Sequence, residues 1–304
     1  MKLFGTSMIN LLSLNIKRPS AIKMMIVSAT IVSTAGLIFR SLESIDAFGV
    51  VFFRGLALSF VMLIVLNAFY RQRVFLTIWS VGRQGVLGAL FFTGAQTFYV
   101  FAFSNTTVAN TTFTIALAPF ITALLAFIVI RERIERTTLL AMAIACLGVV
   151  AIIVTDVSSE GLLGVFFALM TAFCFSCFAV TLRRNKHVEM LPVLLLTGIF
   201  SMIVGLVFGQ WDVIPQIYDI ALCFIWGGVL QGFGQSLLVL STRVLKAAEI
   251  PLIMLLEFSL GPIWVWMFFE EIISLGTLFG GGLIFLSVFG LARHEIRKQR
   301  SLDG

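Results

Sequence analysis

Two ionisable residues interrupt long apolar stretches of the chain. Glu257 lies near the middle of the run Ala248–Phe269, and Arg54 lies about seven residues from one end of the run Ala47–Tyr70. A charge within a membrane must be neutralised, paired or turned toward water, and such residues often serve function. Glu257 could contact a solute or carry a proton, but a protonated glutamate could also merely hydrogen-bond another helix. Arg54 could bind a carboxylate or pair with Glu257, or its long side chain could reach outward to the membrane surface.

Uncharged polar and aromatic residues accompany these charges. Gln96 and Tyr99 share a helix face, and Trp264 follows Glu257 by seven residues, which again places both on one face. Hydrogen-bonding groups beside aromatic rings are typical of a cavity for small amphipathic molecules. The same groups could instead join helices by hydrogen bonds. Asn110 is a further candidate for the mouth of such a cavity, although the sequence does not define its depth.

Arrangements typical of catalysis are missing from the sequence. Cys174 and Cys177 form a C-x-x-C pattern on one helix face, which could serve redox or metal chemistry but is explained more simply by helix packing. The two histidines, His187 and His294, lie in basic segments and have no metal-binding spacing. No G-x-x-x-x-G-K-[ST] pattern for nucleotide binding is present. We therefore expect no enzyme activity, no cofactor and no metal.

The composition indicates a membrane protein. Of the 304 residues, 60% are hydrophobic and only 12% are charged, which leaves too little polar surface for a soluble domain. The net charge of +6 does not indicate a nucleic-acid partner, because the basic residues occupy short connections between apolar runs. About 20 residues are needed to cross a bilayer. Ten runs qualify: Ala21–Arg40, Ala47–Tyr70, Gly85–Phe103, Ala109–Ile130, Thr138–Val154, Gly161–Leu182, Met190–Phe208, Asp219–Thr242, Ala248–Phe269 and Leu275–Ala292.

Charges alternate along these ten runs. Every second connection is basic, as are both ends of the chain, and the remaining connections contain one basic residue, Arg40. The acidic residues on the side of Arg40 are Glu43, Asp46, Asp156, Glu160, Asp212, Asp219, Glu270 and Glu271. Basic connections remain in the cytoplasm, so we expect ten crossings with both termini and the Arg131–Arg136 connection inside.

The two halves of the chain resemble one another. A shift of 139 residues places Gln96 on Gln235, which makes Gln235 a further candidate for the cavity, and Glu132 on Glu271. Five runs in each half mean that the second half enters the membrane in the opposite orientation. Inverted repeats of this kind occur in transporters, with the solute site near the midplane between the halves. We expect an all-α polytopic fold of ten transmembrane helices in two inverted five-helix repeats, at 21–154 and 161–292, between cytoplasmic tails at 1–20 and 293–304.

Three motifs carry a family resemblance. The segments NTTVANTTFTIALAPFITALLAFIVIRERI and AAEIPLIMLLEFSLGPIWVWMFFEEIIS, together with VVFFRG, resemble the EamA branch of the drug/metabolite transporter superfamily. The resemblance covers about Ala21 to Ala292 and implies ten helices in two repeats, a bacterial inner-membrane location and metabolite transport, often outward. One departure is Phe258 where the family often has proline after the glutamate of the ninth helix. Pro262 follows four residues later, so any kink could be displaced.

These observations favour a secondary transporter for small organic solutes, with amino acids or related compounds as expected substrates and efflux as the expected direction. The lipid bilayer is its expected surrounding. Uptake of a metabolite or cofactor is the alternative within the same superfamily, and an intramembrane enzyme is a third hypothesis that the missing catalytic residues disfavour. A coupled proton and a homodimer are left open by the sequence.

Overall fold

The computed structural model describes residues 18–70, 79, 81–131, 136–156, 159–184, 191–209, 215–241, 249–271 and 273–303. Glu132, most of the expected N-terminal tail and several basic connecting residues lie outside this part of the chain. Within it, every regular element is a helix. The elements are α2 (Arg18–Val32), α3 (Ala35–Arg40), α4 (Ala47–Tyr70), α6 (Gly82–Asn105), α7 (Val108–Ile115), α8 (Ala118–Ile130), α9 (Arg136–Asp156), α10 (Ser159–Arg184), α11 (Leu191–Phe208), α12 (Ile217–Phe224), η2 (Ile225–Gly234), α13 (Gln235–Ser241), α14 (Glu249–Phe269) and α15 (Leu275–Asp303).

Eight helical segments in the described residues are long and apolar enough to cross a membrane. They correspond to the first eight expected runs, and the all-helical membrane fold is thereby confirmed. Two further apolar helices, Leu256–Phe269 and Leu275–Leu291, are shorter and fall within the ninth and tenth expected runs.

Three of the expected runs are not regular α-helices. The first is interrupted at Ser33 and Thr34, between α2 and α3, and the fourth at Ala116 and Leu117, between α7 and α8. Pro119 lies in the first turn of α8, where proline is tolerated because a backbone N–H there has no partner within the helix. The eighth run contains a ten-residue π-helix, η2, between α12 and α13. By contrast, α14 continues through Pro262 as one helix.

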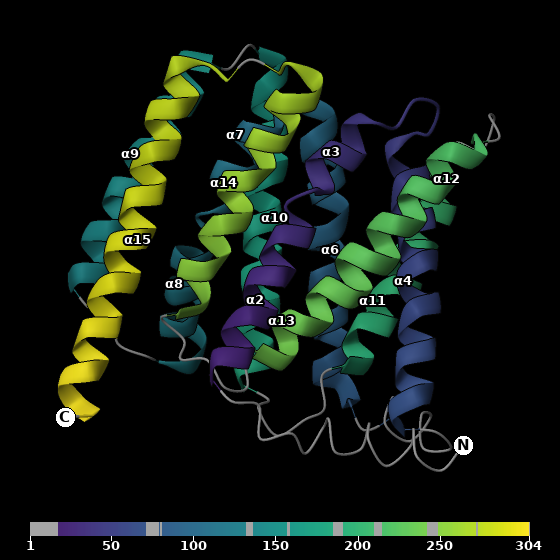
Figure 1. Ribbon diagram of the computed structural model, residues 1–304, viewed down its shortest axis with the longest axis horizontal. Helices are drawn as coiled ribbons and strands as arrows, with labels where there is room; N and C mark the ends of the chain where they lie inside the picture. Colours follow the sequence, from purple (N-terminus) through teal and green to yellow (C-terminus); the bar gives the residue numbers. More distant parts are fainter. Residues whose placement is uncertain are drawn as a thin grey trace.

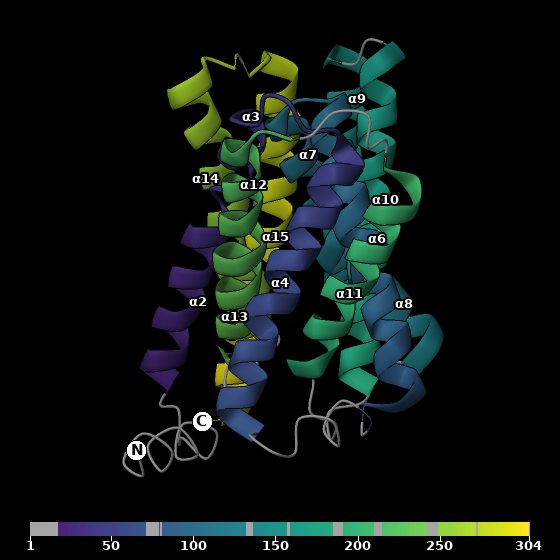
Figure 2. The same ribbon diagram turned by 90° about the vertical axis from the view of Figure 1, so that its right-hand side faces the viewer.

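The helices form one bundle in which elements far apart in sequence lie side by side (Figures 1 and 2). α4 packs along α11, α6 along α10, and α9 along α15. α14 packs against α2 and α3, while α10 packs against α7 and α8. α2 begins and α15 ends at the same end of the bundle (Figure 1), which we call the terminal end.

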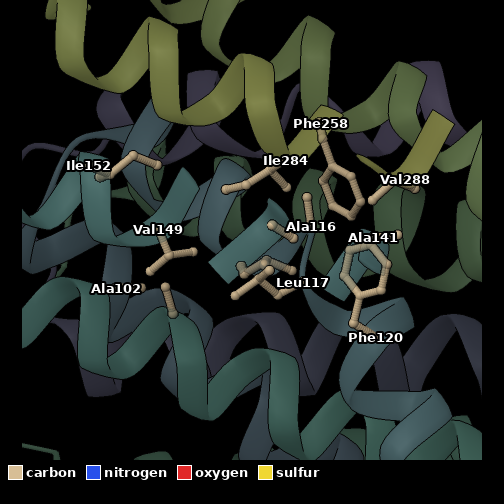
Figure 3. Close-up of a cluster of buried hydrophobic side chains, with 13 residues drawn as sticks. Ala102, Ala116, Leu117, Phe120, Ala141, Val149, Ile152, Phe258, Ile284 and Val288 are labelled. Carbon is tan, nitrogen blue, oxygen red and sulfur yellow. The ribbon is translucent and has the colours of Figure 1, made fainter. Parts of the chain in front are cut away.

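Close crossings depend on small residues. In the contact of α4 with α11, Gly55 and Gly198 lie against each other's carbonyl groups, and Gly148 and Gly280 do the same where α9 crosses α15. Small residues allow this approach in lipid, where packing rather than hydrophobicity drives helix association. Around the second crossing, α7, α8, α9, α14 and α15 bury one apolar cluster that includes Leu117, Phe258 and Ile284 (Figure 3).

The opposite end carries Arg40 and the described acidic connections, as in Glu43, Asp46 and Glu271. The described connections at the terminal end are basic, as in Arg83 and Arg131.

Candidate functional site

Arg54 lies inside the bundle and does not extend toward the membrane surface. Its side chain belongs to α4, and the residue is only 3% exposed. Nη2 donates a hydrogen bond of 2.7 Å to Oε1 of Gln96 on α6. The guanidinium carbon lies 3.9 Å from the centre of the Trp226 ring of η2, a cation–π contact. Nε and Nη1 are buried and have no hydrogen-bond partner among the described residues.

Aromatic rings surround this guanidinium. Trp226 is 1% exposed, and its ring lies edge-on to Tyr99 with 6.2 Å between ring centres. Tyr99 contacts Phe103 at 4.4 Å, and Phe39 packs on Trp226 and Phe103. Arg54, Gln96 and Tyr99 are therefore brought together as predicted, with Trp226 added from the second half of the chain.

The π-helix holds Trp226 in this place. Gly227 lies so close to α4 that a Cβ atom there would overlap the Arg54 carbonyl group. At the other end of η2, the Ser28 hydroxyl of α2 donates a 2.7 Å hydrogen bond to the Gly234 carbonyl. A π-helix leaves backbone carbonyls without their usual α-helical partners, and such segments often occur at functional sites.

Glu257 lies on the inner face of α14. The residue is partly buried, and Phe258 beside it belongs to the buried cluster of Figure 3. One turn later on the same face, Gly261 lies against Thr112 of α7 and the Ser33 carbonyl. Tyr99 packs against both the cluster of Phe258 and the cluster of Trp226, and so links the surroundings of Glu257 and Arg54. Within the described part of the chain, neither of these two charged residues takes part in an ion pair.

The helix interruptions lie close to these residues. The break at Ser33 and Thr34 faces α14 one turn from Glu257, and the break at Ala116 and Leu117 borders the Phe258 cluster. Discontinuous helices expose backbone groups near the midplane, where transporters bind their solutes. The shift of 139 residues that relates the two halves places Glu257 on Ala118, the first residue of α8. Glu257 therefore corresponds to the position in the first half where α7 ends and α8 begins.

The remaining predicted residues are Trp264, Asn110 and Gln235. Trp264 donates its ring N–H to the Ser33 hydroxyl at 2.9 Å and so joins α14 to the break in the first run. Asn110 is buried and accepts a 2.6 Å hydrogen bond from Thr277 at the end opposite the termini. Gln235 is partly buried at the start of α13. Among the described residues, Gln96 and not Gln235 forms the hydrogen bond with Arg54.

A second polar cluster closes the end opposite the termini. Glu271 accepts from Arg40 Nε at 3.0 Å and from the Val108 backbone N–H at 2.8 Å, while Arg40 Nη2 donates to the Thr106 carbonyl at 3.0 Å. The carboxylate therefore sits at the N-terminus of α7, where the helix dipole favours a negative charge. Nearby, Asp219 accepts hydrogen bonds from the backbone N–H groups of Glu43 and Ser44 and from the Ser44 hydroxyl.

Trp226 was not among the residues that the sequence predicted for the site, and its contact with Arg54 is seen only in the structure. The sequence signal that could have identified Trp226 was the neighbouring pair Gly227 and Gly228. Two small residues allow another helix, here the one that contains Arg54, to approach closely. In the described residues, no group of three or more His, Cys, Asp or Glu side chains is arranged to hold a metal.

The chain is thus a multi-pass membrane protein whose polar residues meet inside a helical bundle. Comparison with family models identifies it further. Residues 19–154 match the EamA-like transporter family, which belongs to the drug/metabolite transporter superfamily, and the predicted resemblance is confirmed. A search of curated proteins gives no match.

The bundle also resembles a solved structure described as "Crystal structure of protein". The two chains are 18% identical with a TM-score of 0.63, and the match covers 91% of this chain and 98% of the other. At this identity the likeness shows the fold alone, and it extends through both halves of the chain.

Proposed function

We propose that the protein is a secondary transporter that moves small organic metabolites, amino acids or related compounds, out of the cell across the bacterial inner membrane. The observation that carries this proposal is the pair of charged residues, Arg54 and Glu257, inside the bundle beside interrupted helices. Tyr99 links their surroundings, because it packs against the clusters of both Trp226 and Phe258. Intramembrane charges that lack an ion-pair partner are expected where a solute or ion binds.

The packing of the helices supports two inverted five-helix repeats at 21–154 and 161–292. α4 against α11 and α9 against α15 each pair a helix with its expected counterpart. The contact of α2 with α14 matches the contact of α10 with α8, as a pseudo-two-fold relation requires. In this interpretation α14 and α15 complete ten crossings, and the two repeats move against each other around the central site.

Within that site, we assign substrate binding or proton coupling to Glu257 and substrate contacts to Arg54, Gln96 and Tyr99. Trp264 and Asn110 hold neighbouring helices through their hydrogen bonds to Ser33 and Thr277.

Untargeted metabolite profiling tests the function directly. Cells with and without the protein should differ in the inside-to-outside ratio of a limited set of small metabolites, and higher outside levels would identify efflux. Uptake is the alternative outcome within transport. Unchanged ratios at normal membrane yield would contradict the proposal.

Energy coupling gives a further prediction. Transport in reconstituted vesicles should continue without ATP, because the sequence has no nucleotide-binding motif. Flux is measured with a substrate found by profiling, with ion gradients held constant. Transport that stops when only ATP is withdrawn would refute secondary transport.

A further inference from the structure

The guanidinium of Arg54 has more hydrogen-bond capacity than its neighbours use. An arginine side chain has five N–H donors and no acceptor. Gln96 takes one donor of Nη2, while buried Nε and Nη1 have no partner in the described residues. The Trp226 face compensates part of the positive charge but accepts no conventional hydrogen bond from these two nitrogens. A buried charge with unused donors is unfavourable unless an additional acceptor arrives.

No acidic group in the described part of the chain supplies that acceptor. Asp219 is directed toward Ser44 and the backbone of Glu43, and Glu271 is paired with Arg40. Glu257 forms no ion pair with Arg54 in the described structure. This leaves Nε and Nη1 of Arg54 available to a bound solute.

We propose that Arg54 binds a carboxylate of the transported solute, so that the substrate is a small organic acid or zwitterion and not a neutral or purely cationic compound. Trp226 fixes the guanidinium plane, Gln96 holds one of its nitrogens, and Nε and Nη1 donate to the solute. This inference rests on the proposed transport function and specifies the chemistry of its substrate.

The charge of the site favours a carboxylate over a phosphate. Phosphate carries up to two charges and is usually bound by several cations or by a helix N-terminus. Here one arginine is accompanied by an amide and an aromatic ring. Its two unpartnered nitrogens match the two oxygens and the single charge of a carboxylate.

Arg54→Gln removes the positive charge and is the direct test. Metabolite profiling is carried out with the wild type, Arg54→Gln and the matched control Arg83→Gln, which removes an exposed arginine at the start of α6. We expect every metabolite redistributed by the wild type to contain a carboxylate. Arg54→Gln should abolish that redistribution at normal membrane yield, and Arg83→Gln should preserve it.

Arg54→Lys keeps the positive charge. It tests carboxylate binding if the Arg54→Gln variant is not inserted into the membrane. A lysine cannot contact Gln96 and the solute with the same planar geometry, so the half-saturation concentration should rise at least about tenfold. The inference is overturned if the protein transports compounds without a carboxylate, or if Arg54→Lys leaves the half-saturation concentration unchanged. Either result leaves the proposed transport function intact. If the wild type redistributes no metabolite, the proposed function itself fails.

Discussion

Among single residues, Glu257 gives the sharpest functional prediction. Glu257→Gln keeps the shape and hydrogen bonding of the side chain but removes ionisation. If the carboxyl group carries a proton or pairs with a cationic group of the solute, Gln should abolish concentrative transport at normal membrane expression. Flux across vesicles with an imposed pH gradient measures this effect.

The structural alternative for Glu257 predicts a different pattern. If the group only joins two helices, Gln should preserve transport, whereas Glu257→Ala should lower the yield of folded protein. A Gln variant with unchanged rate, affinity and pH dependence would end the functional assignment.

Gly227 provides a prediction about packing at the site. A Cβ atom in Gly227→Ala would overlap the Arg54 carbonyl group and push η2 away from α4. We expect a loss of about 1–3 kcal/mol, the range for overpacked sites, and a lower melting temperature of the purified protein. Gly282→Ala is the matched control, because a Cβ there meets no neighbour within 4 Å and alanine favours the helix. Equal melting temperatures for both variants would contradict the close contact.

Among elements, the end opposite the termini is held closed by Glu271, which joins α3, α7 and the connection from α14 to α15. Its two oxygens accept from Arg40 and from the Val108 N–H, so one carboxylate restrains three segments. In the proposed transport cycle, a solute that leaves toward this end has to pass between the segments that Glu271 joins. Separation of these segments is therefore required before a solute can pass through this end.

Glu271→Gln should loosen this end, because the amide cannot form the ion pair with Arg40. We expect faster labelling of buried Cys223 by a membrane-impermeant maleimide added from the Glu271 side, as measured by mass spectrometry. Glu270→Gln alters an exposed neighbour and serves as the control. Identical labelling rates in Glu271→Gln, Glu270→Gln and the wild type would show that the cluster does not restrict access.

At the scale of the whole molecule, the charge distribution predicts orientation. Basic described residues such as Arg83, Arg131 and Arg136 belong to the terminal end, and basic connections remain cytoplasmic. Reporter fusions should therefore place both termini and the Arg131–Arg136 connection in the cytoplasm. Cytoplasmic labelling of the Asp212–Asp219 segment would instead overturn the ten-crossing interpretation.

Much of the membrane architecture could be predicted from composition and periodicity. Long apolar runs require a helix in lipid, because each backbone N–H and C=O must be satisfied within its own segment. The first eight runs accordingly match the eight long apolar helical segments of the structure. The same physical reasoning identified Arg54 and Glu257, since a charge within an apolar run is conspicuous in any sequence.

The tertiary structure decided which polar residues meet. Gln96 and Gln235 occupy related positions in the sequence, yet among the described residues only Gln96 hydrogen-bonds Arg54, because α6 packs against α4 at this point. Trp226 became part of the site through the crossing of η2 with α4. Such contacts depend on how two distant segments pack. Hydropathy and helical spacing describe one segment at a time, so they determine that a residue lies in the membrane but not which residue it faces.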